Sequence, residues 1–386
     1  MPLPSPTDCS LTVDGNKLTL LTEGPARLEA LLALIDEATT SLRILYYIFT
    51  GDEAGERVRD ALVRAVDRGV AVSLLIDGFG SSQTPDNYFK ELDDKGARFC
   101  RFNPSFGRRY LLRNHQKLVL ADDRCALIGG FNVENDYFGT PEDGAWRDIG
   151  LIVEGPAAER LGHYFDALMG WALHKGAQLK ALRAVIRHFS ESKGKLQWQF
   201  GGPMQRKSPW ALSTAHDLAH ANSLEMIAAY FAPMASMLSR ISRVADTGGR
   251  VRVITASKSD NRATIDAARH TYGRLLRRKV EMFEYLPTKL HSKLLIMDDV
   301  VHIGSSNFDI RSLYLNMEMM LRVDDPHFAM MMRGYFEHEI GDSEEITATL
   351  HKSRGNWFER LRWWVGFFLV NSLDFTVTRR LARRER

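Results

Sequence analysis

Hydrophobic and polar positions alternate along this chain in blocks that occur twice. Residues 41–78 begin with an aliphatic and aromatic run, continue with apolar positions at helical spacing, and close with the run VAVSLLI before Asp77 and Gly78. This order predicts a strand, an amphipathic helix and a second strand that ends in a turn. Residues 223–257 repeat it, with a closing strand predicted at 250–255. Because a crossover helix must pack back on its sheet, the blocks indicate α/β units with parallel strands.

The two blocks belong to an internal repeat. Ser41 and Ser223 lie 182 positions apart, and Gly69 and Gly249 lie 180 apart. The segment 190–209 is rich in Ser, Gly and Lys, as linkers are. A chain of 386 residues also exceeds one ordinary domain. We therefore predict a first domain at 1–189, a linker at 190–209, a second domain at 210–350 and a tail at 351–386.

A second repeated pattern carries polar residues that are suited to chemistry. The segments are HQKLVLADDRCALIGGFN, with His115, Lys117, Asp122, Gly129 and Asn132, and HSKLLIMDDVVHIGSSN, with His291, Lys293, Asp298, Gly304 and Asn307. Each predicts a β-hairpin that turns at its Asp-Asp pair. Residues i and i+2 share a strand face, so each histidine lies beside its lysine, and the asparagine can come round to them. Such a cluster suits a phosphate better than a metal cation, which the ammonium would repel.

This duplicated pattern resembles the signature of the phospholipase D superfamily, HxKx4D followed by a Gly-x-x-Asn turn. The wording of both halves, with WRD after GGFN and GSSNFDIRSLYLNMEM in the second copy, is similar to bacterial cardiolipin synthases. The resemblance implies two tandem phospholipase-D-like α/β domains related by pseudo-twofold symmetry, with the active site at their interface. It implies neither a metal ion nor a cofactor.

The resemblance also implies a role for each motif residue. His115 would attack phosphorus to form a phosphohistidine, and His291 would protonate the departing alcohol and then activate the acceptor. The remaining polar groups would hold the non-bridging oxygens in the transition state, and they are Lys117, Lys293, Asn132 and Asn307.

Four acidic residues are expected to support this set. Asp122 and Asp298 look like hairpin-turn residues rather than direct participants. Each histidine also needs a carboxylate on its far nitrogen to fix its tautomer. Glu318 follows His291 by 27 positions on a strand-like run and resembles the family's histidine-orienting glutamate, while Asp148 occupies the comparable strand of the first half. The alternative for both is a solvent-facing acid on an edge strand.

The two copies differ in the length of the hairpin. Six residues separate Asp122 from Gly129, but only five separate Asp298 from Gly304. A shift of one residue would move the side chains of the returning strand to the opposite face of the sheet, unless a shorter hairpin turn compensates for the missing residue. We therefore expect a tighter turn at Asp298 and Asp299 that leaves Asn307 in place.

Charge is concentrated at the end of the chain. The net charge is +3, and residues 351–386 hold nine Lys or Arg against three acids, so the body is slightly acidic. An acidic body disfavours a broad nucleic-acid footprint, and no nucleic-acid partner is expected. The tail mixes its arginines with Trp357, Phe358, Leu361, Trp363, Trp364, Phe367, Phe368 and Leu369. This composition favours a helix that lies on anionic lipid, and the alternative is a helix packed on the body with a solvated basic end.

The sequence shows neither a signal-peptide pattern at its start nor a run of apolar residues long enough to span a bilayer. Its three cysteines are far apart and favour a reducing compartment. We therefore expect a peripheral protein on the cytoplasmic face of the membrane. The oligomeric state stays open.

The predicted function is a phosphatidyl transferase of cardiolipin-synthase type, with phospholipids such as phosphatidylglycerol as substrates. A phospholipase D hydrolase that releases phosphatidic acid is the first alternative. A phosphodiesterase or nuclease of the same superfamily is the second, and a noncatalytic membrane-binding module is the third.

Overall fold

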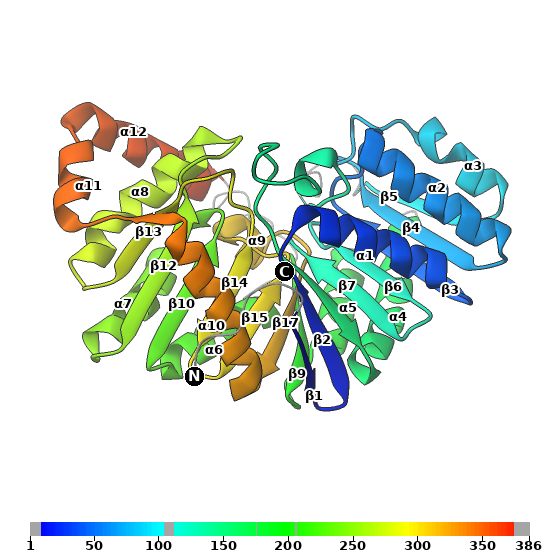
Figure 1. Cartoon of the computed structure of the whole chain (residues 1–386), viewed down its shortest axis with the longest axis horizontal. Coiled ribbons are helices and arrows are strands. Elements are labelled where there is room, and N and C mark those ends of the chain that lie inside the picture. Colours follow the sequence, from blue (N-terminus) through cyan, green and yellow to red (C-terminus); the bar gives the residue numbers. More distant parts are fainter. Residues whose placement is uncertain (1–8, 104–111, 175, 205–206, 374–386) are drawn as a thin grey trace.

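Each half of the chain builds an eight-stranded sheet, and the two sheets lie side by side (Figure 1). The structure is a computed structural model that describes residues 9–103, 112–174, 176–204 and 207–373. Helices pack on both faces of each sheet, so the α/β class and the tandem arrangement expected from the repeat are confirmed.

The first sheet has the strand order β1-β2-β8-β7-β6-β3-β4-β5. Its strands are β1 (Ser10–Val13), β2 (Asn16–Leu21), β3 (Ser41–Tyr46), β4 (Ala71–Asp77), β5 (Arg98–Phe102), β6 (Leu118–Ala121), β7 (Cys125–Gly129) and β8 (Gly150–Glu154). The strands β3, β4 and β5 pair in parallel, as the strand-helix-strand pattern predicted, and the other pairs are antiparallel. Six of the seven residues of β4 are buried, as expected for a parallel strand covered on both faces.

The second sheet repeats this topology in the order β18-β13-β12-β10-β14-β15-β17-β9, with β18 added at one edge. Its strands are β9 (Leu196–Gly201), β10 (Ser223–Ala228), β12 (Arg250–Ala256), β13 (Glu281–Tyr285), β14 (Lys293–Met297), β15 (Val300–Gly304), β17 (Glu318–Asp324) and β18 (Ser343–Glu345). A separate short pair joins β11 (Phe231–Ala232) to β16 (Phe308–Asp309).

The segment predicted as a linker is only partly a linker. Residues 196–201 form β9, which pairs with β17 along its whole length and is fully buried. Its place beside β17 matches that of β2 beside β8, so the repeat starts further upstream than residue 210. The polar composition of 190–209 concealed this strand, because Gln197 and Gln199 alternate along it with the buried aromatic residues Trp198 and Phe200.

Helices complete each half. Those of the first half are α1 (Gly24–Glu37), α2 (Glu53–Asp67), α3 (Lys90–Asp94), α4 (Pro156–Leu173) and α5 (Leu179–Phe189), with short 3-10 turns η1 (Asp86–Phe89) and η3 (Asn135–Tyr137). Those of the second half are α6 (Pro209–His220), α7 (Ala235–Asp246), α8 (Arg262–Leu276), α9 (Ile310–Tyr314), α10 (Pro326–Gly341), α11 (Ala348–Arg354) and α12 (Trp357–Phe368), followed by a π-helical turn, η4 (Leu369–Leu373).

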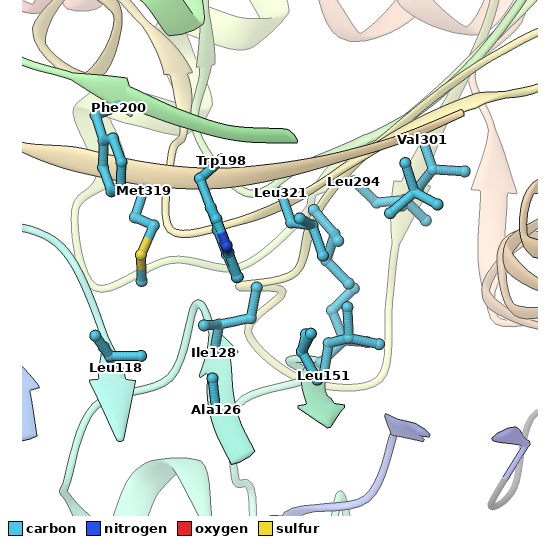
Figure 2. Packing of buried hydrophobic residues seen from close by; sticks show 14 of the residues in the cluster. Leu118, Ala126, Ile128, Leu151, Trp198, Phe200, Leu294, Val301, Met319 and Leu321 are labelled. Carbon is cyan, nitrogen blue, oxygen red and sulfur yellow. The ribbon is translucent and has the colours of Figure 1, made fainter. Parts of the chain in front are cut away.

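One hydrophobic core joins the two halves. It contains side chains from both sheets and from α4 and α10. Figure 2 shows Trp198, Met319 and Leu321 of the second sheet pointing toward Ile128 and other residues of the first. Separate cores lie on the outer faces, under α1 and α2 in the first half and under α6, α7 and α8 in the second. Because burial of apolar area dominates stability, this shared core holds the two motifs in a fixed relation.

The C-terminal helix α12 packs on α8 at one end of the molecule (Figure 1). Trp363 is buried and stacks on His351 at 5.1 Å between ring centroids, while Arg362 pairs with Asp266 at 3.1 Å. The residues 374–386, which carry the last five arginines of the predicted tail, lie outside the described residues. Across the ranges that the structure describes, no helix has both the length and the apolar character needed to cross a bilayer.

Candidate active site

The two motif histidines lie at the boundary between the halves, just before the first strand of each hairpin. His115 precedes β6, and His291 precedes β14. The backbone N–H of His115 donates to the carbonyl of Met317 at 2.9 Å, and that of His291 donates to the carbonyl of Arg147 at 2.7 Å. Each histidine is therefore held by the backbone of the opposite half.

As a result, the carboxylate that contacts each histidine comes from the opposite half. Met317 is followed by Glu318, whose Oε2 lies 3.1 Å from Nδ1 of His115. Arg147 is followed by Asp148, whose Oδ2 lies 2.7 Å from Nδ1 of His291. Both carboxylates are fully buried, so the alternative of a solvent-facing acid is wrong for each. Sequence order gave no sign that the acid of one half would serve the histidine of the other.

The motif lysines lie in the same buried site. The ammonium of Lys117 donates to the backbone carbonyl of His115 at 2.7 Å, and that of Lys293 donates to the carbonyl of His291. Lys117 also lies 5.4 Å from the ring centroid of Tyr47, which packs on His115. Burial lowers the pKa of Lys117 to about 7 and that of Lys293 to about 8, and the charge of Lys293 further lowers the pKa of Lys117.

Burial and these two cations also act on the histidines. Burial, with Lys117 and Lys293, holds the pKa of His115 well below its usual value, and burial with Lys293 lowers the pKa of His291 to about 3. Burial and the two lysines thus favour the neutral form of both imidazoles. A bound phosphodiester would add negative charge and would raise the pKa of whichever histidine must carry a proton.

The lysines give the site a predictable pH dependence. A lysine with a depressed pKa loses its charge as the pH rises through that value, so the free site should begin to lose affinity for a phosphodiester at about pH 7, where Lys117 titrates, and lose more above about pH 8, where Lys293 titrates. For each lysine the charged fraction falls about tenfold per pH unit beyond its pKa. We expect kcat/KM to fall from about pH 7 upward and more steeply above about pH 8, mainly through a rise in KM. Steady-state kinetics between about pH 6 and pH 10 would check this, and a KM that stays constant would contradict it.

The two carboxylates are not equivalent. Burial opposes ionisation of Asp148, but His291 and Lys293 outweigh it and lower the pKa of this carboxyl, whereas burial raises the pKa of Glu318 to about 8. Ser305 donates to Glu318 at 2.5 Å. Its counterpart in the first repeat is Gly130, where a Cβ atom would stand 2.7 Å from the carboxylate of Asp148. A glycine is therefore required beside Asp148, and a hydroxyl is accommodated beside Glu318.

The motif asparagines follow the returning strands and are both buried. Asn132 accepts from the N–H of Ile48 at 3.2 Å and donates to the hydroxyl of Tyr137 at 3.0 Å. Asn307 keeps its Oδ1 without a hydrogen-bond partner among the residues that the structure describes. The assignment of both side chains to phosphate oxygens stays a prediction.

The expectation about the hairpin turns is confirmed. Ala121 pairs with Cys125 in the first hairpin and Met297 with Val300 in the second, so the turns contain three and two residues. The shorter turn absorbs the missing residue, and Gly304 still pairs with β17 as Gly129 pairs with β8.

The motif aspartates sit at these turns, about 16 Å of extended chain beyond the lysines. Asp122 accepts from the backbone N–H groups of Thr40 and Ser41 at 2.8 and 2.9 Å, and Asp298 accepts from that of Ser223 at 2.9 Å. Through these hydrogen bonds, each carboxylate links its hairpin turn to the start of the first parallel strand of its own half. This geometry fits the supporting role predicted for them.

Several neighbours of His291 were missed by the sequence reasoning. The rings of Tyr137, Trp146 and Tyr230 surround it, with centroids 5.1, 5.2 and 6.5 Å from the imidazole. Trp146 stands two residues before Asp148, so the WRD segment that supported the family resemblance also places a tryptophan beside His291. His115, in contrast, packs on Tyr47 at 5.0 Å.

Comparison with known proteins shows which family this chain resembles. Residues 31–169 and 214–340 match the family model described as cardiolipin synthase, PLD-like domain. Cardiolipin synthase A of Pseudomonas aeruginosa is 30% identical over 87% of this chain and 69% of its own length. The major cardiolipin synthase ClsA of Bacillus subtilis is 29% identical over 89% of this chain and 73% of its own.

A solved structure shares the fold across the whole chain. The crystal structure of phosphatidylserine synthase from Haemophilus influenzae aligns with a TM-score of 0.71 at 14% identity, and the alignment covers 98% of this chain and 97% of that one. At this identity the likeness concerns the fold alone. The family match does not depend on it, and because its two segments together span more than half of the 386 residues, the chain belongs to the family of cardiolipin synthase PLD-like domains, within the phospholipase D superfamily.

Proposed function

We propose that the chain is a phosphatidyl transferase of cardiolipin-synthase type that joins two molecules of phosphatidylglycerol and releases glycerol. The observation that carries this proposal is the meeting of two histidines, each with its own buried carboxylate, and two lysines in one site. The relatives named cardiolipin synthase support phospholipid as the substrate class.

In the first step, Nε2 of His115 attacks the phosphorus of the donor lipid. A nitrogen-phosphorus bond forms, and the bond from phosphorus to the glycerol oxygen breaks. His291 gives the proton on its Nε2 to that oxygen, so glycerol leaves as a neutral alcohol. Lys117 and Lys293 hold the non-bridging oxygens, whose charge they balance.

In the second step, the hydroxyl of another phosphatidylglycerol attacks the phosphohistidine. His291, now neutral, takes the hydroxyl proton, the nitrogen-phosphorus bond breaks, and His115 is regenerated. Asp148 keeps the Nδ1–H tautomer of His291 through both steps, so that Nε2 is the nitrogen that exchanges the proton.

The test is to incubate the protein with phosphatidylglycerol vesicles and identify the products by mass spectrometry. We expect cardiolipin and glycerol from the wild type and neither product from His115→Ala. The matched control is His327→Ala, because the His327 side chain is 73% exposed and should leave the product pattern unchanged.

Other products would contradict this proposal and identify one of the alternative functions. Phosphatidic acid with free glycerol would identify a hydrolase, because water would then have reached the phosphohistidine first. Unchanged lipid together with cleavage of single-stranded DNA or a bis-aryl phosphodiester would identify a phosphodiesterase or nuclease. Liposome binding that is the same for wild type and His115→Ala, with no turnover of any substrate, would identify a binding module.

We further propose that the protein works as a peripheral protein on the cytoplasmic face of the membrane, and that α12 contacts the lipid. Its inner side packs on α8 through Trp363, while its outer side exposes Trp357, Phe358, Leu361, Trp364, Val365, Phe368 and Leu369. Aromatic side chains favour the bilayer interface, and the arginines that follow in the sequence would be attracted to anionic lipid.

Replacing two outer aromatic residues should therefore weaken membrane binding. Trp364 and Phe368 stack on each other on the outer side of α12, and each would lose about 1.5–3 kcal/mol of burial in lipid. We expect the double change Trp364→Ser with Phe368→Ser to reduce sedimentation with phosphatidylglycerol liposomes by at least about tenfold. Leu212→Ser, at an exposed position of α6, is the control. Equal binding of both variants would place the membrane contact elsewhere.

A further inference from the structure

A buried arginine outside the motifs lies behind the His291 side of the site. Arg27, on α1, is 1% exposed. Its guanidinium donates to the backbone carbonyl of Asp148 at 2.5 Å, to that of Tyr137 at 2.8 Å and to that of Thr22 at 2.9 Å. The Cζ atom of the same group lies over the ring of Phe131, 5.8 Å from its centroid.

Two of these carbonyls belong to residues that touch His291. Asp148 binds Nδ1 of the imidazole at 2.7 Å, and the ring of Tyr137 lies 5.1 Å from it. The rigid fork of a guanidinium fixes both backbone segments at once, which a lysine, with a single flexible ammonium, cannot do. Arg27 thus sets the position of the acid behind His291 and of one aromatic wall beside it.

The charge of Arg27 acts on the same carboxylate. It is one of the groups that lower the pKa of Asp148, after His291 and Lys293, whose effects are larger. An ionised Asp148 accepts the Nδ1–H of His291 and so keeps Nε2 available for proton exchange. A buried cation is costly unless it compensates nearby negative charge, and Arg27 has this carboxylate and three carbonyls around it.

The helix of the second half that corresponds to α1 carries no such cation. This helix, α6, contains no lysine or arginine. There Trp210 donates to the hydroxyl of Ser306 at 2.7 Å and Ser208 donates to the carbonyl of Leu313, in α9, at 3.1 Å, so neutral groups link α6 to Ser306 and to α9. A buried guanidinium on this helix is therefore not a general requirement of the repeated fold.

We propose that Arg27 is a positioning residue for His291, acting through Asp148 and Tyr137 to hold the imidazole ready for proton transfer to and from the alcohol oxygen. This inference rests on the proposed function of His291 as the acid and base of a phosphatidyl transfer. Arg27 touches neither substrate nor reacting atoms in this account. Its loss should slow proton transfer and leave substrate binding nearly unchanged.

The first experiment compares two donors with different needs for a proton. Glycerol leaves phosphatidylglycerol only when it is protonated, whereas p-nitrophenolate leaves phosphatidyl-p-nitrophenol without a proton. For Arg27→Met we expect kcat with phosphatidylglycerol to fall about 10–100-fold, which is the usual effect of losing a group that orients an active-site residue. The KM should stay within about threefold of the wild-type value. The burst of p-nitrophenolate should stay within about threefold of wild type. The kcat of Arg27→Lys with phosphatidylglycerol should lie between those of the wild type and Arg27→Met, because lysine keeps the charge but not the forked geometry of the guanidinium.

Control variants separate this effect from damage to the fold. Arg183→Met removes another buried arginine, on α5, whose Nε donates to the carbonyl of Pro203 at 2.7 Å, and it should leave both donor reactions near wild type. Thermal unfolding of each variant reports stability. If Arg27→Met does not fold, Arg27→Lys supplies the same comparison.

The second experiment is a double-mutant cycle with Asp148→Asn. If Arg27 acts through Asp148, the losses in kcat from the two changes should not multiply, whichever step His291 serves. Losses that multiply would overturn the proposal, as would an Arg27→Met variant that loses the burst as strongly as phosphatidylglycerol turnover, or one that loses neither.

Different results would reject the proposed function rather than the role of Arg27. A wild type that does not turn over phosphatidylglycerol would reject that function, and the cycle would then be measured with the p-nitrophenyl donor. A His291→Ala variant that loses the burst would reject the acid role of His291, while the cycle with Asp148→Asn would still decide whether Arg27 acts through it.

Discussion

Replacement of His115 by alanine is expected to lower phosphatidyl transfer by at least about 10⁴-fold, the scale on which loss of a catalytic nucleophile acts. His115 has the geometry for this role, because Glu318 engages its Nδ1 and leaves Nε2 for the phosphorus. No covalent lipid adduct should form on this variant with any donor.

The matched variant His291→Ala should behave differently with a donor that needs no acid. With phosphatidyl-p-nitrophenol, the first step should proceed, but the acceptor hydroxyl would lack its base, so the phosphatidyl-enzyme should accumulate. Mass spectrometry of the intact protein would detect the phosphatidyl group on His291→Ala and its absence from His115→Ala. The reverse pattern would exchange the two roles and make His291 the nucleophile.

The chemistry of this site could be predicted from sequence because it is local. The spacing of His115 and Lys117, and of His291 and Lys293, places each pair on one strand face, and the repeat brings a second copy. The need for a carboxylate behind each histidine also follows from elementary acid-base chemistry. Glu318 and Asp148 were found by that argument and by resemblance.

The crossing of the pairs could not be predicted, because it depends on contacts between distant segments. Asn114 pairs with Met317 and Arg147 with Leu290 as isolated bridges between the halves, across 203 and 143 positions. Short bridges of this kind leave no hydrophobic pattern. Without them, sequence order would assign each acid to its own half.

Arg27 did leave a signal in the sequence that was not used. The buried side of α1 consists of Gly24, Arg27, Leu28, Leu31 and Ile35, at helical spacing. A charged residue on an otherwise apolar helical stripe must find buried partners, and so points to a site. The outer side of α12, in contrast, was visible in sequence as an aromatic cluster, but the burial of Trp363 against α8 was not.

The second large effect is expected at the junction of the halves. Arg147 donates to the carboxylate of Glu339, on α10, through Nε at 2.9 Å and Nη2 at 2.6 Å, and the Glu339 side chain is fully buried. In addition, the Arg147 carbonyl accepts from the N–H of His291. This ion pair thus joins α10 to the segment that leads to Asp148.

Arg147→Met should therefore destabilise the protein by about 3–5 kcal/mol, because it leaves the buried Glu339 without its partner. Chemical unfolding would measure this. The control is the double variant Arg147→Met with Glu339→Leu, which removes both charges and should recover most of the loss. If the double variant is as unstable as the single one, packing rather than charge explains the defect.

The pH dependence of the single variant provides an independent check. Burial already raises the pKa of Glu339 with Arg147 present, so it should rise further without that cation. Below its unfolded pKa the carboxyl is protonated in both states and costs no stability. As the pH rises from the unfolded pKa to the raised folded pKa, only the unfolded state ionises, so the folded state loses stability. The defect of Arg147→Met should consequently be smaller near pH 5 than near pH 8. A defect that is constant over this range would show that loss of Arg147 does not raise the pKa of Glu339, and that the ion pair does not hold the halves together through its charge.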